Sequence, residues 1–483
     1  MTFGGLLDAA LAGTLRQAPP SVVTDDAELS AEGRLVRGAS FEGLRRLAGR
    51  RVQHDTADLV QVAPCPPETK PELPAAAAVR LLEILSDRPD LLPEWLALAV
   101  ARGGRVPHAY LPDLLDHAAE CDETIQDLVI ELGGERLVWL AGLDPDSEWR
   151  FAARVDTANA VAFGGREERV RALRWLRRHD PAQARELLVE ALASESGEAR
   201  GQLLATLDTG LSLDDEPLLE EALRDSRKEA RQVALRLIRA LPESRFAQRW
   251  AERARQVIGL KKGLLGTILE IHPPTEADPA WIADGLDPRP PKDVGDKAWL
   301  LQQVLALAPP GIWPTSMLGA VESSDWAQPA IAGLGQAALA YGDADWSEEL
   351  LLAWAHATLE REMAPINATA LFQGLAAPRA ERALRRLLEA TPAATPPLAS
   401  AWKHRWSPEF SRYFTGRLPK LLQTWEYAAT GVLRPASLCL DPCVLPEAEH
   451  VLAGLPESVW TRLSMERLVH MLEFRDALRS ELA

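Results

Sequence analysis

The order of apolar and polar residues repeats at a constant spacing of 31 between residues 166 and 258. Each copy opens with an acidic residue, a second residue and an arginine, at 167–169, 198–200 and 229–231. Small or apolar residues follow each arginine after three and seven positions: Ala172, Leu203, Ala234, and Leu176, Leu207, Ile238. The sequence Leu-Leu-x-x-Ala-Leu then recurs at 187–192 and 218–223. Two helical patterns in each period predict stacked pairs of antiparallel helices.

The acidic residue, small residue and arginine that open the repeat resemble the first helix of HEAT repeats. Helix-length apolar patterns also occupy most of the remaining chain, and no run alternates with the period of two that is typical of a half-buried strand. We therefore predict an all-α fold, a HEAT-like α-solenoid built as a right-handed superhelix of antiparallel helix pairs, with helical N- and C-terminal extensions.

Proline-rich breaks near 65–74, 272–291 and 391–397 divide the helical patterns. We expect the first break to be extended and exposed, and the Gly259–Thr267 stretch to be a loop that enters the next helix. The predicted domains are N-terminal helices with a proline-rich linker (1–75), a helical N-terminal domain (76–160), the HEAT-like core (161–271), a proline-rich insertion (272–297) and a C-terminal helical domain (298–483).

Several short motifs, in order along most of the chain, resemble an uncharacterised bacterial family, the domain of unknown function 5691. The motifs are Leu11-Ala12-Gly13-Thr14-Leu15-Arg16, residues 111–116, residues 134–141, Asp284-Gly285 with Pro290-Pro291, and residues 305–313. The chain departs from the family at Arg136-Leu137-Val138-Trp139-Leu140, where the family favours Arg-Gly-Arg-Trp-Leu. The resemblance supplies no catalytic residues. It implies a protein partner, a MoxR-type ATPase or a von Willebrand A-type protein.

The formal charge of −17 disfavours a general affinity for nucleic acids or anionic membranes. Only residues 166–262 are slightly basic, with 20 Lys and Arg against 17 Asp and Glu, which leaves a net charge of −20 on the rest. Four cysteines are too few for a disulfide framework. The first fifteen residues lack the pattern of a signal peptide, and no apolar stretch is long and unbroken enough for a membrane span. We expect a cytoplasmic, soluble protein.

The candidate catalytic and metal-binding groups have ordinary explanations. Asp113, His117 and Cys121 share one edge of a helix, but a single helix seldom completes a metal site. Cys439 and Cys443 lack a second cysteine pair, so two half-buried thiols are expected. The Gly259–Thr267 stretch lacks the Gly-Lys-Ser/Thr ending of a phosphate-binding loop. We predict no catalytic residues, cofactor or metal, with an unrecognised enzymatic activity as the third alternative.

A row of arginines is the strongest candidate for a binding surface. At 100° per residue, Arg171, Arg174 and Arg178 lie opposite the apolar face of their helix, so they are exposed unless another element covers them. Arg227, Lys228, Lys261 and Lys262 could extend this row into a basic strip. The alternative is a solvated face that pairs with nearby glutamates.

A second arginine series has a structural interpretation. Arg169, Arg200 and Arg231 recur on the inward side of the repeat, where we expect them to bond acidic side chains or carbonyls of neighbouring repeats. Most of the 15 tryptophans are expected to be core wedges, with one or two exposed as binding anchors.

The sequence therefore predicts a non-enzymatic scaffold or adaptor that binds an acidic surface of a protein partner through the basic strip. The alternative is a helical-repeat protein that binds nucleic acid through residues 166–262.

Overall fold

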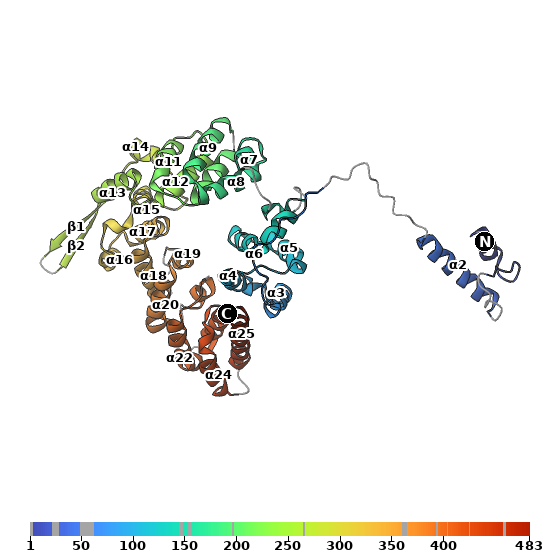
Figure 1. Ribbon diagram of the computed structural model, residues 1–483. Helices are drawn as coiled ribbons and strands as arrows, with labels where there is room; N and C mark the ends of the chain where they lie inside the picture. The colour runs from blue at the N-terminus through green and yellow to red at the C-terminus, as the bar shows by residue number, and fades with distance from the viewer. Residues whose placement is uncertain are drawn as a thin grey trace. The chain divides into compact units, whose positions relative to one another are not determined.

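Almost all of the regular secondary structure in the described residues is helical, which confirms the predicted all-α class. The computed structural model describes residues 3–21, 29–48, 62–143, 148–152, 157–195, 198–263, 266–359, 365–392, 395–402, 404–424, 426–456 and 460–483 (Figure 1). Contacts divide the chain into a small unit, Met1–Pro64, and a large unit, Cys65–Ala483. The small unit holds α1 (Phe3–Ala12) and α2 (Ala31–Ala48), which contact each other.

The large unit begins with four helices around a core of their own. They are α3 (Ala75–Asp87), α4 (Leu92–Arg102), α5 (Leu111–Ala119) and α6 (Glu123–Ala141). The apolar residues of α5 recur every three or four positions, and the resulting stripe is fully buried as its spacing predicts. Trp95 of α4 lies at the centre of this core, where its indole N–H donates to the Ala77 carbonyl at 3.1 Å.

The proline-rich stretch before α3 is extended, but the prediction that it is exposed is wrong at two positions. The Leu73 side chain is buried, and the Glu68 carboxylate accepts hydrogen bonds from the backbone N–H groups of Glu135 and Arg136, both at 3.0 Å. Gly134 interrupts α6 just before these residues, with φ 64° and ψ −162°. Glu68 thus satisfies the free N–H groups at the start of the second half of α6.

Seven α-helices occupy the described residues from 157 to 257, which include most of the predicted repeat region (Figure 1). They are α7 (Thr157–Phe163), α8 (Arg166–His179), α9 (Pro181–Ser194), α10 (Glu198–Ala205), α11 (Glu216–Ala222), α12 (Lys228–Arg239) and α13 (Arg245–Val257). The residues at the equivalent positions three and seven after each repeated arginine are all buried: Ala172, Leu176, Leu203, Leu207, Ala234 and Ile238. The period of 31 therefore corresponds to a recurring core position.

The repeated arginines hold neighbouring segments together as predicted. Arg169 pairs with Glu195, beyond the end of α9. Arg200 contacts the Asp225 carboxylate at 2.5 Å and also donates to the Leu192 carbonyl, whereas Arg231 donates to the backbone carbonyl of Asp225 at 2.7 Å. These contacts confirm the structural role of the series.

The prediction of a loop at Gly259–Thr267 is wrong. Strands β1 (Ile258–Gly263) and β2 (Gly266–Ile271) form an antiparallel pair there, with Leu260 opposite Leu269. Both leucines are partly buried against the larger hydrophobic core of the large unit, which draws its residues from Ala160 to Leu472 and which we call the main core. Isoleucines at 258, 268 and 271 favour extended backbone, and this preference outweighs the glycines and lysines that obscure the strand pattern in the sequence.

The remaining helices continue the main core to the end of the chain. They are α14 (Pro279–Ala283), α15 (Asp296–Leu307), α16 (Leu318–Glu322), α17 (Ala327–Tyr341), α18 (Ala344–Leu359), α19 (Ala368–Gln373), α20 (Ala377–Ala390), α21 (Thr395–Ala401), α22 (Pro408–Thr424), α23 (Glu426–Cys439), α24 (Leu445–Ala453) and α25 (Trp460–Leu482).

The last helix connects the two cores of the large unit. Met465, Leu468 and Leu472 of α25 belong to the main core, which extends back to α7. Phe474 and Leu478 belong to the core of α3–α6, and α25 contacts both α3 and α4. The end of the large unit is therefore packed against its beginning.

Candidate functional site

A pocket of about 430 Å³ lies between α6 and α8, at the row of arginines that the sequence singles out. We call it the α6–α8 pocket. Its lining residues come from α6, the short helical turn Glu148–Ala152, α8 and α10: Glu123, Gln126, Asp127, Ile130, Phe151, Glu167, Val170, Arg171, Arg174, Trp175, Arg178, Gln202 and Ala205.

The apolar face of α8 determines which of its side chains reach the pocket. Ala172 and Leu173 belong to the main core and Leu176 is also buried, so the arginine row faces the opposite way, as its spacing predicts. Carboxylates of α6 nevertheless pair with two of these arginines, of which Arg174 is half-buried and Arg178 is exposed. Arg174 pairs with Glu123, and Arg178 approaches Asp127 at 2.9 Å.

The two walls of the pocket carry opposite charges in close contact. Glu123 accepts a hydrogen bond from Arg174 at one carboxylate oxygen and from Arg178 at the other. Burial raises the pKa of the Asp127 carboxyl, although the neighbouring Arg178 acts in the opposite direction. Since the arginines already have carboxylate partners, the predicted alternative of a glutamate-paired face describes Arg174 and Arg178 correctly.

Trp175 gives the pocket an exposed aromatic side chain. It is 47% exposed and stacks on His179, with the ring centroids 4.0 Å apart. By contrast, tryptophans such as Trp95, Trp250 and Trp346 are fully buried core residues. Half-buried apolar side chains of α6 and α8 also line the pocket. An exposed indole beside such a surface can anchor a bound segment.

The remaining residues of the predicted basic strip do not line this pocket. Arg227 lies 3.6 Å from Asp225 at the start of α12, where Lys228 is exposed. Lys261 pairs with Glu270 across the hairpin at 2.7 Å, and the Lys262 side chain lies outside the described residues. Figure 1 places α8 and the hairpin at opposite ends of the repeat helices, so the proposed strip is not one continuous cluster.

A buried ion pair that the sequence does not indicate also fixes α8, through a residue that does not line the pocket. Arg177 is 1% exposed and forms two hydrogen bonds with Asp215, at 2.7 and 2.9 Å. It also donates to the carbonyls of Thr209 and Gly210. Removal of one partner from a buried pair leaves an uncompensated charge, so this contact holds α8 in a defined orientation.

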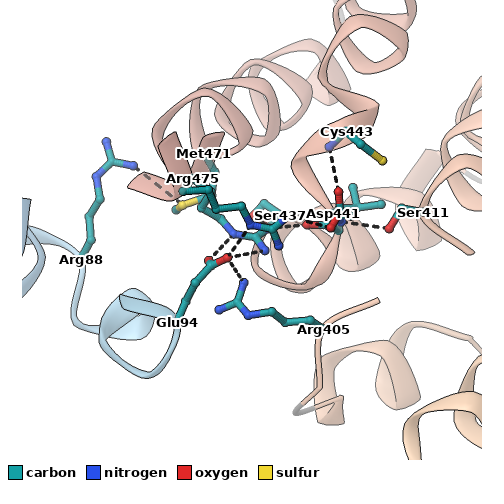
Figure 2. A network of polar contacts seen from close by, with 11 residues as sticks. Arg88, Glu94, Arg405, Ser411, Ser437, Asp441, Cys443, Met471 and Arg475 are labelled. Carbon is teal, nitrogen blue, oxygen red and sulfur yellow. Dashed lines mark hydrogen bonds and ion pairs between the residues drawn. The ribbon is translucent and has the colours of Figure 1, made fainter. Parts of the chain in front are cut away.

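A second missed network joins the two ends of the large unit. Figure 2 shows Glu94 pointing from α4 toward Arg475 of α25 and Arg405, the guanidinium of Arg475 lying 2.6 Å away. Arg475 also donates to the carbonyls of Ser437 and Leu440. Nothing in the local sequence indicates this pair, because its members lie 381 residues apart.

The environment of Glu94 favours its charged form. Burial alone would raise the pKa of Glu94, but hydrogen bonds and charge from Arg475, with further charge from Arg405, outweigh burial and lower it. Burial lowers the pKa of Arg405 to about 10, so this arginine still carries its charge at neutral pH. We call this network the Glu94 clasp, since it connects α4 with α25.

The other candidate groups do not form a site in the described structure. No three His, Cys, Asp or Glu side chains among the described residues are placed to hold a metal ion. Cys121 donates to the His117 carbonyl within its own helical segment. The expectation of two half-buried thiols is wrong, since Cys439 is buried and Cys443 is exposed.

A comparison with curated proteins finds no match. Within the described parts of the chain, no helix is both long and apolar enough to cross a membrane. One family model matches the chain nearly from end to end, over residues 5–482. The chain therefore belongs to the family of unknown function DUF5691.

Proposed function

We propose that this protein is a non-enzymatic helical scaffold or adaptor that binds a segment of a partner protein in the α6–α8 pocket. The observation that carries the proposal is the exposed Trp175 in a pocket lined by half-buried apolar side chains. Binding energy at protein interfaces concentrates in such aromatic residues. The matching family has no known function, and the described residues contain no metal-binding cluster, so neither observation points to an enzymatic activity.

A solenoid arrangement is part of this proposal. Several helices pack against the next helix but one along the chain: α8 against α10, α10 against α12, and α15 against α17. This contact pattern is typical of stacked helix pairs and supports a HEAT-like repeat array. The five-domain division and a cytoplasmic, bacterial setting remain predictions that accompany it.

The partner that the family resemblance implies is a MoxR-type ATPase or a von Willebrand A-type protein. We propose such a protein as the ligand of the pocket, because rigid helices can present a binding surface for a partner without any catalytic group.

The alternative of nucleic-acid binding receives less support. Arg174 and Arg178 would have to exchange the carboxylates of Glu123 and Asp127 for phosphates. The two carboxylates would then remain near the phosphates and repel them.

Co-purification of the tagged full-length protein from its native cells tests the proposed function. We expect a protein partner that the wild type retains and that a Trp175→Glu variant loses. Phe163→Ala is the matched control, because Phe163 is 85% exposed on the adjacent helix α7 and does not line the pocket. Retention of the same partner by folded Trp175→Glu protein would contradict the proposal.

A further inference from the structure

We infer that the α6–α8 pocket takes a basic segment of its partner, one that carries a lysine or arginine beside an apolar side chain. This inference rests on the proposed function and reverses the acidic partner surface that the sequence predicts. It depends on which charged side chains of the pocket expose the larger fraction of their surface to solvent.

The side chains of Glu123 and Asp127 expose a larger fraction of their surface than the arginine side chains with which they pair. The side chains of Glu123 and Asp127 are 47% and 49% exposed, whereas Arg174 and Arg178 are 29% and 34% exposed. Each Glu123 oxygen accepts one hydrogen bond from these arginines. Because a carboxylate has about four acceptor positions, Glu123 can accept further donors from a ligand.

An acidic ligand would meet a less favourable surface. To reach Arg174 and Arg178 it would have to displace the carboxylates of α6, which would then lie beside the new negative charge. A basic ligand leaves both ion pairs in place. Its charge would also favour the ionised form of Asp127, whose pKa burial raises.

Trp175 provides a second contact for the same kind of group. An exposed indole attracts a lysine or arginine side chain through its ring face, and tryptophan is the strongest of the aromatic residues in this interaction. An adjacent apolar side chain of the ligand would cover the half-buried Ile130, Phe151 and Val170.

The charge of the whole chain acts in the same direction over a longer distance. A formal charge of −17 at pH 7 attracts basic segments and repels acidic ones, and this field raises the association rate of a basic partner at low salt. The more exposed side chains of Glu123 and Asp127 and the overall charge thus favour the same ligand.

Selection of random peptides displayed on phage tests the inference with the full-length protein. Peptides are selected on the wild type, and those that bind Trp175→Glu equally well are removed. We expect the remaining peptides to carry net positive charge and at least one large apolar residue. If they are neutral or acidic, the charge inference is wrong and binding at the pocket stands. If no peptide depends on Trp175, both the inference and the proposed function are wrong.

Affinity measurements on one selected peptide then locate the charge contact. Asp127→Asn should weaken its binding about threefold, the loss expected for a half-exposed ion pair. Glu190→Gln is the matched control, since Glu190 is an exposed carboxylate on α9 outside the pocket. Melting temperatures identify variants that lose their fold. Equal affinity for wild type and folded Asp127→Asn and Glu123→Gln variants would overturn the inference.

Discussion

Glu94 lies 2% exposed among three guanidinium groups, those of Arg405, Arg475 and Arg479. A buried charge of this kind is stable only while its partners surround it. The residue therefore connects local chemistry with the contact between α4 and α25.

Loss of the Glu94 charge should destabilise the large unit. For Glu94→Gln we expect the free energy of unfolding to fall by about 3–5 kcal/mol, because the buried Arg475 loses its carboxylate partner. Denaturant unfolding measures the effect. Glu83→Gln is the control, since its pair with Arg80 is partly exposed and should contribute less than about 1 kcal/mol. Equal losses in the two variants would contradict the structural role of the clasp.

The contribution of Glu94 to the free energy of unfolding should depend on pH. The pKa of Glu94 is lowered in the folded protein, so its stabilising contribution is present above the unfolded pKa and is lost as pH falls through the folded value. The difference in unfolding free energy between wild type and Glu94→Gln should therefore shrink as pH falls below about 4.3, the usual pKa of glutamate. A difference that grows in acid would show that Glu94 is not held charged by its arginines.

Gly134 has a backbone conformation that other residues adopt only with strain. A Cβ atom there would also lie 2.4 Å from a Glu68 carboxylate oxygen. We expect Gly134→Ala to lower the free energy of unfolding by at least about 2 kcal/mol. Gly416→Ala, in the open middle of α22, should instead stabilise by about 0.5–1 kcal/mol. Thermal unfolding distinguishes the two variants. If Gly134→Ala leaves the free energy of unfolding unchanged, the kink in α6 does not require a glycine.

At the scale of helices and strands, regular apolar spacing was the most informative part of the sequence. The buried stripe of α5 and the recurring core positions of α8, α10 and α12 follow from local periodicity. The β-hairpin was missed because glycines and lysines interrupt its strands. The row of arginines on α8 was predictable, but its ion pairs with α6 were not. Glu123, the partner of Arg174, lies 51 residues earlier in the chain.

The repeat itself can be tested on α10. Leu204 is 1% exposed, so Leu204→Asp would bury an unpaired charge and remove apolar contacts. We expect a loss of at least about 3 kcal/mol in the free energy of unfolding. Val189→Asp, at an exposed position on α9, should cost less than about 1 kcal/mol. If the melting temperature of Leu204→Asp equals that of the wild type, Leu204 does not belong to the core of the repeat region.

At the scale of the whole molecule, charge distinguishes the two classes of ligand. Nucleic acid should not bind detectably even at about 50 mM salt, because the chain is strongly acidic and Arg174 and Arg178 of the pocket already have carboxylate partners. Electrophoretic mobility shift with labelled DNA and RNA measures this. Salt-dependent binding that weakens when Arg174 and Arg178 are removed would contradict the expectation and support the nucleic-acid alternative.

The most direct test of the scaffold proposal is hydrogen exchange of the full chain with and without its co-purified partner. Amide exchange reports which segments a bound protein covers or stabilises. We expect slower exchange in α6 and α8 when the partner is bound, with α18 and α20 unchanged. Protection confined to other helices, with α6 and α8 exchanging as in the free protein, would show that the α6–α8 pocket is not the binding site.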